Sequence, residues 1–144
     1  MLFRSGPILL TQQLAPMITD GGRVLNVSTG LTRNMVNPAY SVYAAMKGAV
    51  EVWTGYLAKD LGARGIAVNV IAPGATATDF AGGQIRDSDA YRSRIVATSA
   101  MGRVGEPDDI GGVIAALLSP TAGWMTGQRI EAAGGQGMGR GVAG

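Results

Sequence analysis

Tyr43 and Lys47 are the two residues whose types and spacing could carry out chemistry. They stand four positions apart, in the stretch YAAMK. On a helix this spacing places two side chains on the same face, about one turn apart. A lysine ammonium near a phenol stabilises the phenolate and lowers the tyrosine pKa, so the phenol can exchange a proton near neutral pH. The pair predicts general acid–base chemistry, with an ordinary solvated pair as the alternative for so common a spacing.

The residue types that are absent narrow the chemistry further. The 144 residues include no cysteine and no histidine, which excludes disulfides, thiolate nucleophiles, Cys/His zinc sites and Ser-His-Asp triads. Asp108 and Asp109 are expected to serve a helix N-terminus, and no metal site is predicted. The net charge is +2 and the ten arginines are scattered, so we expect no nucleic-acid or membrane surface. We expect one soluble, cytoplasmic domain.

Short buried strands alternate with helical patterns along the chain. Strands are predicted at 23–28, 65–72 and, more weakly, 128–131. Helices are predicted at 7–19, with Pro7 in the first turn, at 41–61, ending at Gly62, and at 87–98 and 106–118. This order predicts parallel strands joined by right-handed crossovers, with helices on both faces of the sheet.

Hydroxyl groups and a turn follow the ends of the first two strands. Ser28 and Thr29 come after the first, and Pro73-Gly74 after the second. Ligands of open α/β sheets gather at the carboxyl edge of the strands. We therefore expect these residues and the Tyr43/Lys47 pair to share one cleft, although each could also be an ordinary loop residue.

Several ordered motifs resemble the C-terminal half of a short-chain dehydrogenase/reductase. They are GRVLNVSTG at 22–30, YAAMKGAV at 43–50, RGIAVNVIAPGATAT at 64–78, GRVGEPDDI at 102–110 and TGQ at 126–128. The resemblance implies a partial Rossmann-type, doubly wound parallel sheet of about three strands with flanking helices. It places the C-terminal part of that domain at 1–133, followed by a mobile glycine-rich tail at 134–144.

The resemblance also implies roles for particular residues. Tyr43 would be the general acid–base, and Lys47 would lower its pKa and hold the nicotinamide ribose. The substrate-orienting serine of the family falls at Thr29, with Ser28 as the open alternative, and Tyr40 is a rival for Tyr43. The implied cofactor-binding residues include Tyr43 and Lys47. The others are Pro73, Gly74, Thr76 and Thr78, which would lie along the nicotinamide and diphosphate, and Ile71, which would lie behind the carboxamide. The 78–98 loop would cover the substrate, with Phe80, Ile85 and Tyr91 as its bulky groups.

The glycine-rich turn and the Asn-Ala-Gly stretch of the family are both absent from the 144 residues. Family members open with a strand and the turn Thr-Gly-x-x-x-Gly-x-Gly, which cradles the pyrophosphate, and no such context occurs here. The resemblance implies an oxidoreductase that uses NAD or NADP on a small-molecule alcohol or carbonyl group, with the adenosine and pyrophosphate half of the cofactor site missing. The alternative is an inactive fragment that serves only assembly or interaction. A homo-oligomer is expected in either case.

Overall fold

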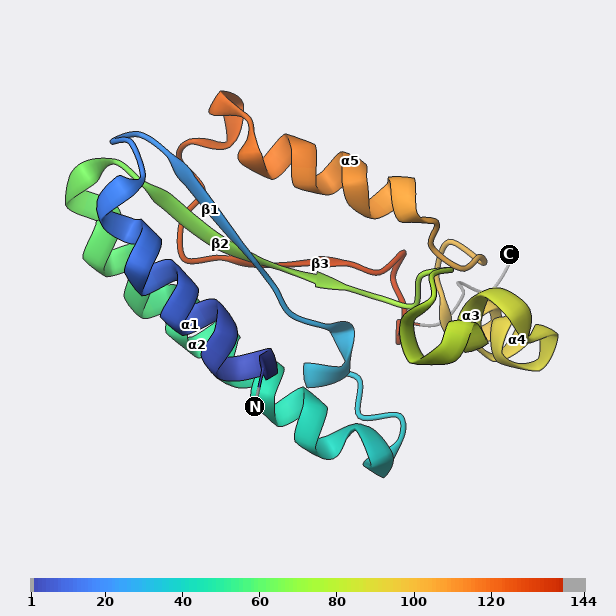
Figure 1. Ribbon diagram of the computed structural model, residues 1–144. Helices are drawn as coiled ribbons and strands as arrows, with labels where there is room; N and C mark the ends of the chain where they lie inside the picture. The colour runs from blue at the N-terminus through green and yellow to red at the C-terminus, as the bar shows by residue number, and fades with distance from the viewer. Residues whose placement is uncertain (1, 139–144) are drawn as a thin grey trace.

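Three parallel strands form a single sheet in the computed structural model, which describes residues 2–138 (Figure 1). They are β1 (Arg23–Val27), β2 (Ala67–Pro73) and β3 (Arg129–Ala132), in the spatial order β1-β2-β3. Val27 pairs with Ile71, and Ile71 with Ile130, so the carboxyl ends of all three strands meet at one edge. The predicted α/β class with about three parallel strands is confirmed.

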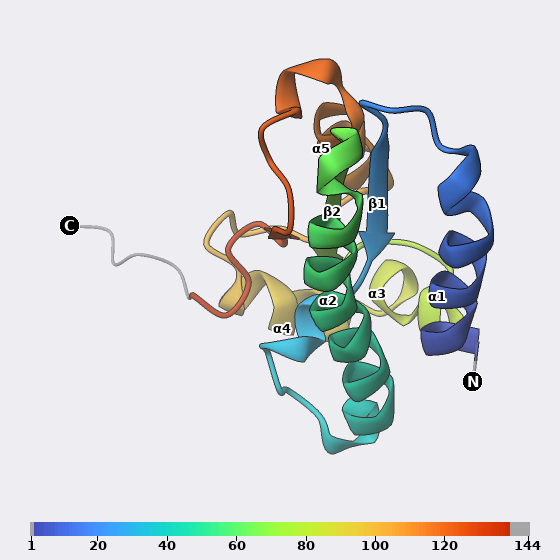
Figure 2. The same ribbon diagram turned by 90° about the vertical axis from the view of Figure 1, so that its left-hand side faces the viewer.

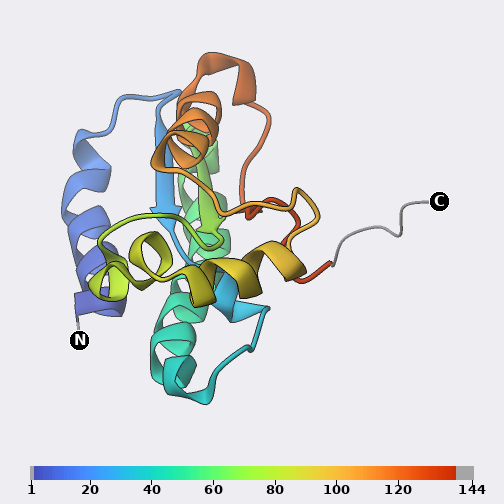
Figure 3. The ribbon, with the colours of Figure 1, turned by 90° about the vertical axis from the view of Figure 1, so that its right-hand side faces the viewer.

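Helices cover both faces of this sheet. The helices α1 (Leu2–Leu14) and α2 (Ser41–Leu61) lie on one face and α5 (Pro107–Leu118) on the other (Figures 1 and 2). The short helices α3 (Gln84–Asp87) and α4 (Asp89–Thr98) lie beyond the carboxyl ends of the strands (Figure 3). Single 3-10 turns occupy η1 (Ala15–Met17), η2 (Gly30–Thr32), η3 (Pro38–Tyr40), η4 (Gly62–Arg64), η5 (Phe80–Gly83) and η6 (Pro120–Ala122).

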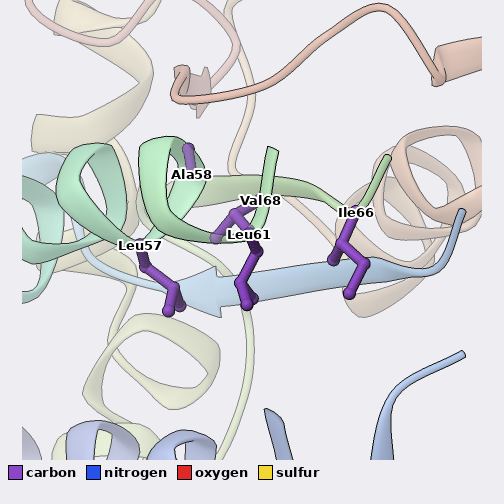
Figure 4. Packing of buried hydrophobic residues seen from close by; sticks show 5 residues of the cluster. All are labelled: Leu57, Ala58, Leu61, Ile66 and Val68. Carbon is purple, nitrogen blue, oxygen red and sulfur yellow. The ribbon is translucent and has the colours of Figure 1, made fainter. Parts of the chain in front are cut away.

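The core forms where α2 packs on the central strand. The buried cluster joins α2 to β2 (Figure 4). It contains Ile66, just before β2, and Val68, within β2, packed with Leu57, Ala58 and Leu61 of α2. A strand in the middle of a parallel sheet is covered on both faces, so it carries a continuous apolar run rather than an alternating one. This packing fixes α2, and with it the Tyr43/Lys47 face, against the sheet.

A buried hydrogen bond also joins α2 to β1. The Asn26 amide of β1 donates to the Thr54 hydroxyl of α2 at 2.9 Å, and that hydroxyl donates to the Val50 carbonyl at 2.8 Å. Because both side chains are buried, sliding the helix along β1 would leave an amide without its partner, at a cost of about 1–3 kcal/mol. The contact therefore fixes the height of α2 along β1.

Two helix boundaries differ from the sequence prediction, and a third helix ends as predicted with an added turn. Pro7 lies inside α1 rather than in its first turn, so this helix tolerates one missing backbone hydrogen bond near its beginning. The α2 helix has the predicted bounds, but Gly62 stays right-handed and the left-handed termination falls at Gly65, with φ 64°. The helix predicted at 87–98 is broken at Ser88, whose hydroxyl caps α4 by accepting from the Tyr91 amide at 3.4 Å.

The first part of the predicted glycine-rich tail is packed against the fold. The Gly134 carbonyl accepts from the Ser99 hydroxyl at 2.9 Å and from the Met101 amide at 3.0 Å, and the Gly137 amide donates to Thr98. Contacts with the rest of the fold thus continue to Gly137 instead of ending at residue 134, and 139–144 lie outside the described residues. Within residues 2–138, no helix combines the length and apolar character needed to cross a membrane.

Candidate active site

The first part of α2 places Tyr43 and Lys47 beside the end of β1. The Lys47 ammonium donates to the Val27 carbonyl, the last of β1, at 2.7 Å, and lies 6.0 Å from the centre of the Tyr43 ring. The predicted helical spacing therefore brings both side chains to the carboxyl edge of the sheet. The Phe80 ring lies 5.8 Å from the Tyr43 ring at a tilted angle.

The two hydroxyl residues after β1 have different partners. Thr29 hydrogen-bonds to Tyr43 and accepts from the Leu31 amide at 3.3 Å. The Ser28 hydroxyl instead donates to Glu51 at 2.5 Å and lies 3.5 Å from the Lys47 carbonyl. Of the two alternatives left open by the sequence, the hydroxyl that meets the Tyr43 phenol is that of Thr29.

The turn after β2 is held tightly against the end of β3. The Gly74 amide donates to Ala132 at 3.0 Å, and the Ala75 amide donates to the Gln136 side chain at 3.0 Å. A Cβ on Gly74 would lie 2.6 Å from the Ala133 Cβ, so only glycine allows this approach. Thr76 extends the turn and pairs with Gly105, which fixes the far end of the segment.

These groups surround one cavity of about 760 Å³ at the carboxyl edge. Of the predicted site residues, those that line it are Ser28, Thr29, Tyr43, Lys47, Pro73, Gly74, Thr76 and Thr78. Ile71 does not line the cavity, because it is fully buried within β2. The expected covering residues Phe80, Ile85 and Tyr91 line the cavity, and so does the rival Tyr40.

Burial dominates the ionisation of the central pair. It raises the pKa of Tyr43 above the ordinary tyrosine value, and the hydrogen bond with Thr29 offsets part of that rise. Burial also lowers the pKa of Lys47. The sequence predicted a lowered tyrosine pKa from the nearby ammonium alone. The predicted and observed shifts of the Tyr43 pKa have opposite directions, because spacing carries no information about how far the phenol is removed from water.

The cavity fits one end of a nicotinamide dinucleotide. Lys47 can meet a ribose hydroxyl, Thr76 and Thr78 offer hydroxyls, and the tight turn at Gly74 lines the cavity beside them. A pyrophosphate is held by a glycine-rich turn that leads from a strand into a helix. In the sheet of residues 2–138, β1 and β2 lead into 3-10 turns or irregular loops, so the described residues fit the nicotinamide end alone.

Three residues around the site were not singled out by the sequence. Gln136 holds the Ala75 amide from the glycine-rich segment, which looked like a tail. Glu51 and Arg129 form an ion pair at 2.9 Å behind Ser28. Glu51 continues the four-residue spacing of Tyr43 and Lys47, so the sequence alone could have predicted that it shares their helix face. Arg129 and Gln136 had none, since their contacts depend on how β3 lies in the sheet.

Comparisons with known proteins agree on a single family. The family profile described as Enoyl-(Acyl carrier protein) reductase matches residues 4–136. An uncharacterized oxidoreductase of Methylorubrum extorquens is 38% identical over 130 residues, which cover 90% of this chain and 52% of that protein.

Solved structures give the same result. The promiscuous reductase LugOII, which catalyses keto-reduction at C1 during lugdunomycin biosynthesis, matches with a TM-score of 0.86 and 38% identity, over 94% of this chain and 52% of its own. The angucycline C-6 ketoreductase LanV with bound NADP matches with a TM-score of 0.85 and 36% identity, over 95% and 52%. The chain thus spans about half the length of the relatives it matches.

Proposed function

The chain belongs to the short-chain dehydrogenase/reductase family, and on that premise we propose that it carries the acid–base half of an NAD(P)-dependent ketone reductase. The observation that carries this proposal is the Thr29–Tyr43–Lys47 arrangement at the edge of a cavity. A phenol, a hydroxyl partner and a nearby ammonium are the groups needed to move a proton to or from a substrate oxygen.

The chain's own residues supply the proton and its orientation. In the reductive direction the Tyr43 hydroxyl donates its proton to the substrate carbonyl oxygen, and the Thr29 hydroxyl hydrogen-bonds to that same oxygen. A bound nicotinamide dinucleotide supplies the hydride. Lys47, anchored on the Val27 carbonyl, lies close enough to the Tyr43 ring to stabilise the phenolate that remains. In the oxidative direction Tyr43 accepts the proton of the alcohol.

The cavity lining favours a bulky and largely apolar ketone. Phe80, Ile85, Tyr91, Ile95 and Ile110 supply apolar side chains to its wall. Aromatic and aliphatic walls with few polar groups select by shape and apolar contact. Reduction of a keto group is also the reaction named for LugOII and LanV, which supports a ketone as the substrate class.

The test measures reduction of 1-tetralone, a fused-ring aromatic ketone, by loss of absorbance at 340 nm. NADPH, NADH and reduced nicotinamide mononucleotide are compared, because the mononucleotide lacks the adenosine for which the described residues offer no site. We expect the mononucleotide to serve nearly as well as the dinucleotides. We expect Tyr43→Phe to lose most of the turnover.

Two further tyrosine variants control that experiment. Tyr56→Phe removes a phenol hydroxyl from the exposed face of α2 and is expected to keep the wild-type rate. Tyr40→Phe tests the rival tyrosine directly. If Tyr43→Phe turns over at nearly the wild-type rate, or Tyr40→Phe loses the activity instead, the assignment of Tyr43 as the acid–base is wrong.

A second proposal concerns self-association through α2. Val42, Val52 and Tyr56 are exposed at 66–73% and lie within one stripe of this helix. Exposed apolar stripes of this kind mark association surfaces. We propose that a second copy of the chain covers the stripe, in line with the expected homo-oligomer. Light scattering on Val52→Glu tests it: the variant is expected to have a lower mass than wild type, and equal masses would refute the assignment.

A further inference from the structure

A buried ion pair lies directly behind the acid–base residues. Glu51 follows Lys47 by four residues on α2, so Tyr43, Lys47 and Glu51 share one face of the helix. Glu51 pairs with Arg129, the first residue of β3, at 2.9 Å. Their side chains are only 16% and 8% exposed. The acid–base face of α2 therefore continues into a charged contact that reaches across the sheet.

One carboxylate oxygen of Glu51 joins three parts of the fold. Its Oε1 accepts from the Ser28 hydroxyl at 2.5 Å, from the Thr32 hydroxyl at 2.8 Å and from Arg129 Nε at 2.9 Å. Ser28 and Thr32 flank Thr29 in the segment that follows β1. The oxygen thus ties this segment, from both sides of Thr29, to the helix that carries Tyr43.

The Arg129 guanidinium holds the backbone of the same segment. It donates to the Thr29 carbonyl at 3.3 Å and to the Thr32 hydroxyl at 3.1 Å. Its third nitrogen pairs with Glu131 at 2.9 Å, which fixes the plane of the guanidinium on β3. Because the Thr29 side chain meets Tyr43, the arginine acts on the acid–base pair through one intervening residue.

We propose that Glu51 and Arg129 are positioning residues that hold the Thr29 hydroxyl against the Tyr43 phenol. This inference rests on the proposed function. A flexible loop could present Thr29 at many distances, whereas four hydrogen bonds to Ser28, Thr29 and Thr32, together with the Glu51–Arg129 ion pair, leave one arrangement. Burying a charged pair is seldom the most stabilising choice, since apolar replacements often match or exceed it in stability. Beyond packing, the ion pair fixes the position of the Thr29 hydroxyl relative to the Tyr43 phenol.

The alternative is that the pair anchors α2 without affecting the chemistry. The two interpretations differ in what happens to a variant that remains folded. An anchor changes the free energy of unfolding alone. A positioning pair changes the ionisation of Tyr43, because the hydrogen bond from Thr29 holds the phenol's pKa below the value that burial alone would set.

The experiment compares three variants of the chain. Arg129→Met keeps the length of the side chain but leaves Glu51 buried without its cation. The double variant Glu51→Gln/Arg129→Met removes both charges, so it avoids that penalty and keeps the test valid if the single variant fails to fold. Arg64→Met is the matched control, because Arg64 pairs with exposed Asp20 at the opposite, amino-terminal edge of the sheet.

The main measurement is the alkaline titration of Tyr43, followed at 295 nm after subtraction of Tyr43→Phe in the same background. We expect the double variant to titrate at a higher pH than wild type, and Arg64→Met to titrate as wild type does. With NADPH and 1-tetralone, kcat is expected to fall on the order of 10- to 100-fold while KM changes little.

A folded double variant with the wild-type titration would overturn the proposal. A downward shift would also overturn it, because it would mean that Tyr43 had become solvated rather than lost the Thr29 hydroxyl. Absence of turnover in the wild-type chain would contradict the proposed function instead. The titration needs neither cofactor nor substrate, so it decides the role of the pair in that case as well.

Discussion

Replacing Thr29 by valine isolates the hydroxyl that meets Tyr43. Valine has nearly the shape of threonine and the same branching at Cβ, so the extended backbone of this residue suits both. The Thr29 carbonyl keeps its bond from Arg129, which holds the loop in place. The substitution therefore removes the bond to Tyr43 and the weak cap on the Leu31 amide, and little else.

The two losses have different sizes and different readouts. The cap at 3.3 Å is long, so its loss should cost about 0.5 kcal/mol of stability, at the low end for capping residues. A hydroxyl that binds the reacting oxygen is comparable to a donor in an oxyanion hole, whose removal lowers kcat by about 10²- to 10³-fold. A large kinetic effect in a nearly wild-type fold is the expected result for Thr29→Val.

Urea unfolding and NADPH-dependent reduction of 1-tetralone measure these two quantities. Thr29→Ser restores the hydroxyl and should return kcat to within a few-fold of wild type. Ser28→Ala should lower kcat less than Thr29→Val, because the Ser28 hydroxyl is bonded to Glu51. A Thr29→Val enzyme that retains a third or more of the wild-type kcat would refute the assigned role, as would a larger loss in Ser28→Ala.

Two further predictions follow from the ionisation of Tyr43 and from the turn after β2. Because its folded-state pKa is raised, Tyr43 contributes stability that is fully present below about pH 10 and is lost as the pH rises through the folded-state pKa. Urea unfolding from pH 9 to 11 should therefore show a steeper loss for wild type than for Tyr43→Phe, and equal slopes would contradict the raised pKa. Gly74→Ala should destabilise the chain by about 1–3 kcal/mol because its Cβ meets Ala133, whereas Gly55→Ala, on α2 with open space around it, should stabilise it by about 0.5–1 kcal/mol. Thermal unfolding compares the two alanine variants, and a neutral Gly74→Ala would show that the turn can relax.

The parts of the fold that the sequence predicted well are those fixed by local pattern. The bounds of α2 follow from apolar residues at helical spacing between Ser41 and Leu61, and the strand at 67–73, predicted at 65–72, follows from a run that is apolar except for Asn69. The break at Ser88 and the left-handed Gly65 were missed. Both depend on how the chain continues after a helix, and that is settled by the packing of the following segment rather than by propensity.

The same division between local and distant information applies to the site. Tyr43 and Lys47 are separated by one helical turn, so their proximity follows from the helix alone, and the parallel order of the strands then brings Thr29 and Gly74 to the same edge. Arg129 lies 78 residues from Glu51, and no local pattern relates them. Their proximity depends on strand register. Arg129 pairs with Val70 of β2, and this pairing places the arginine side chain next to the segment after β1. A carboxylate already committed to two hydroxyls there can be buried only with a cation close by, and β3 supplies it.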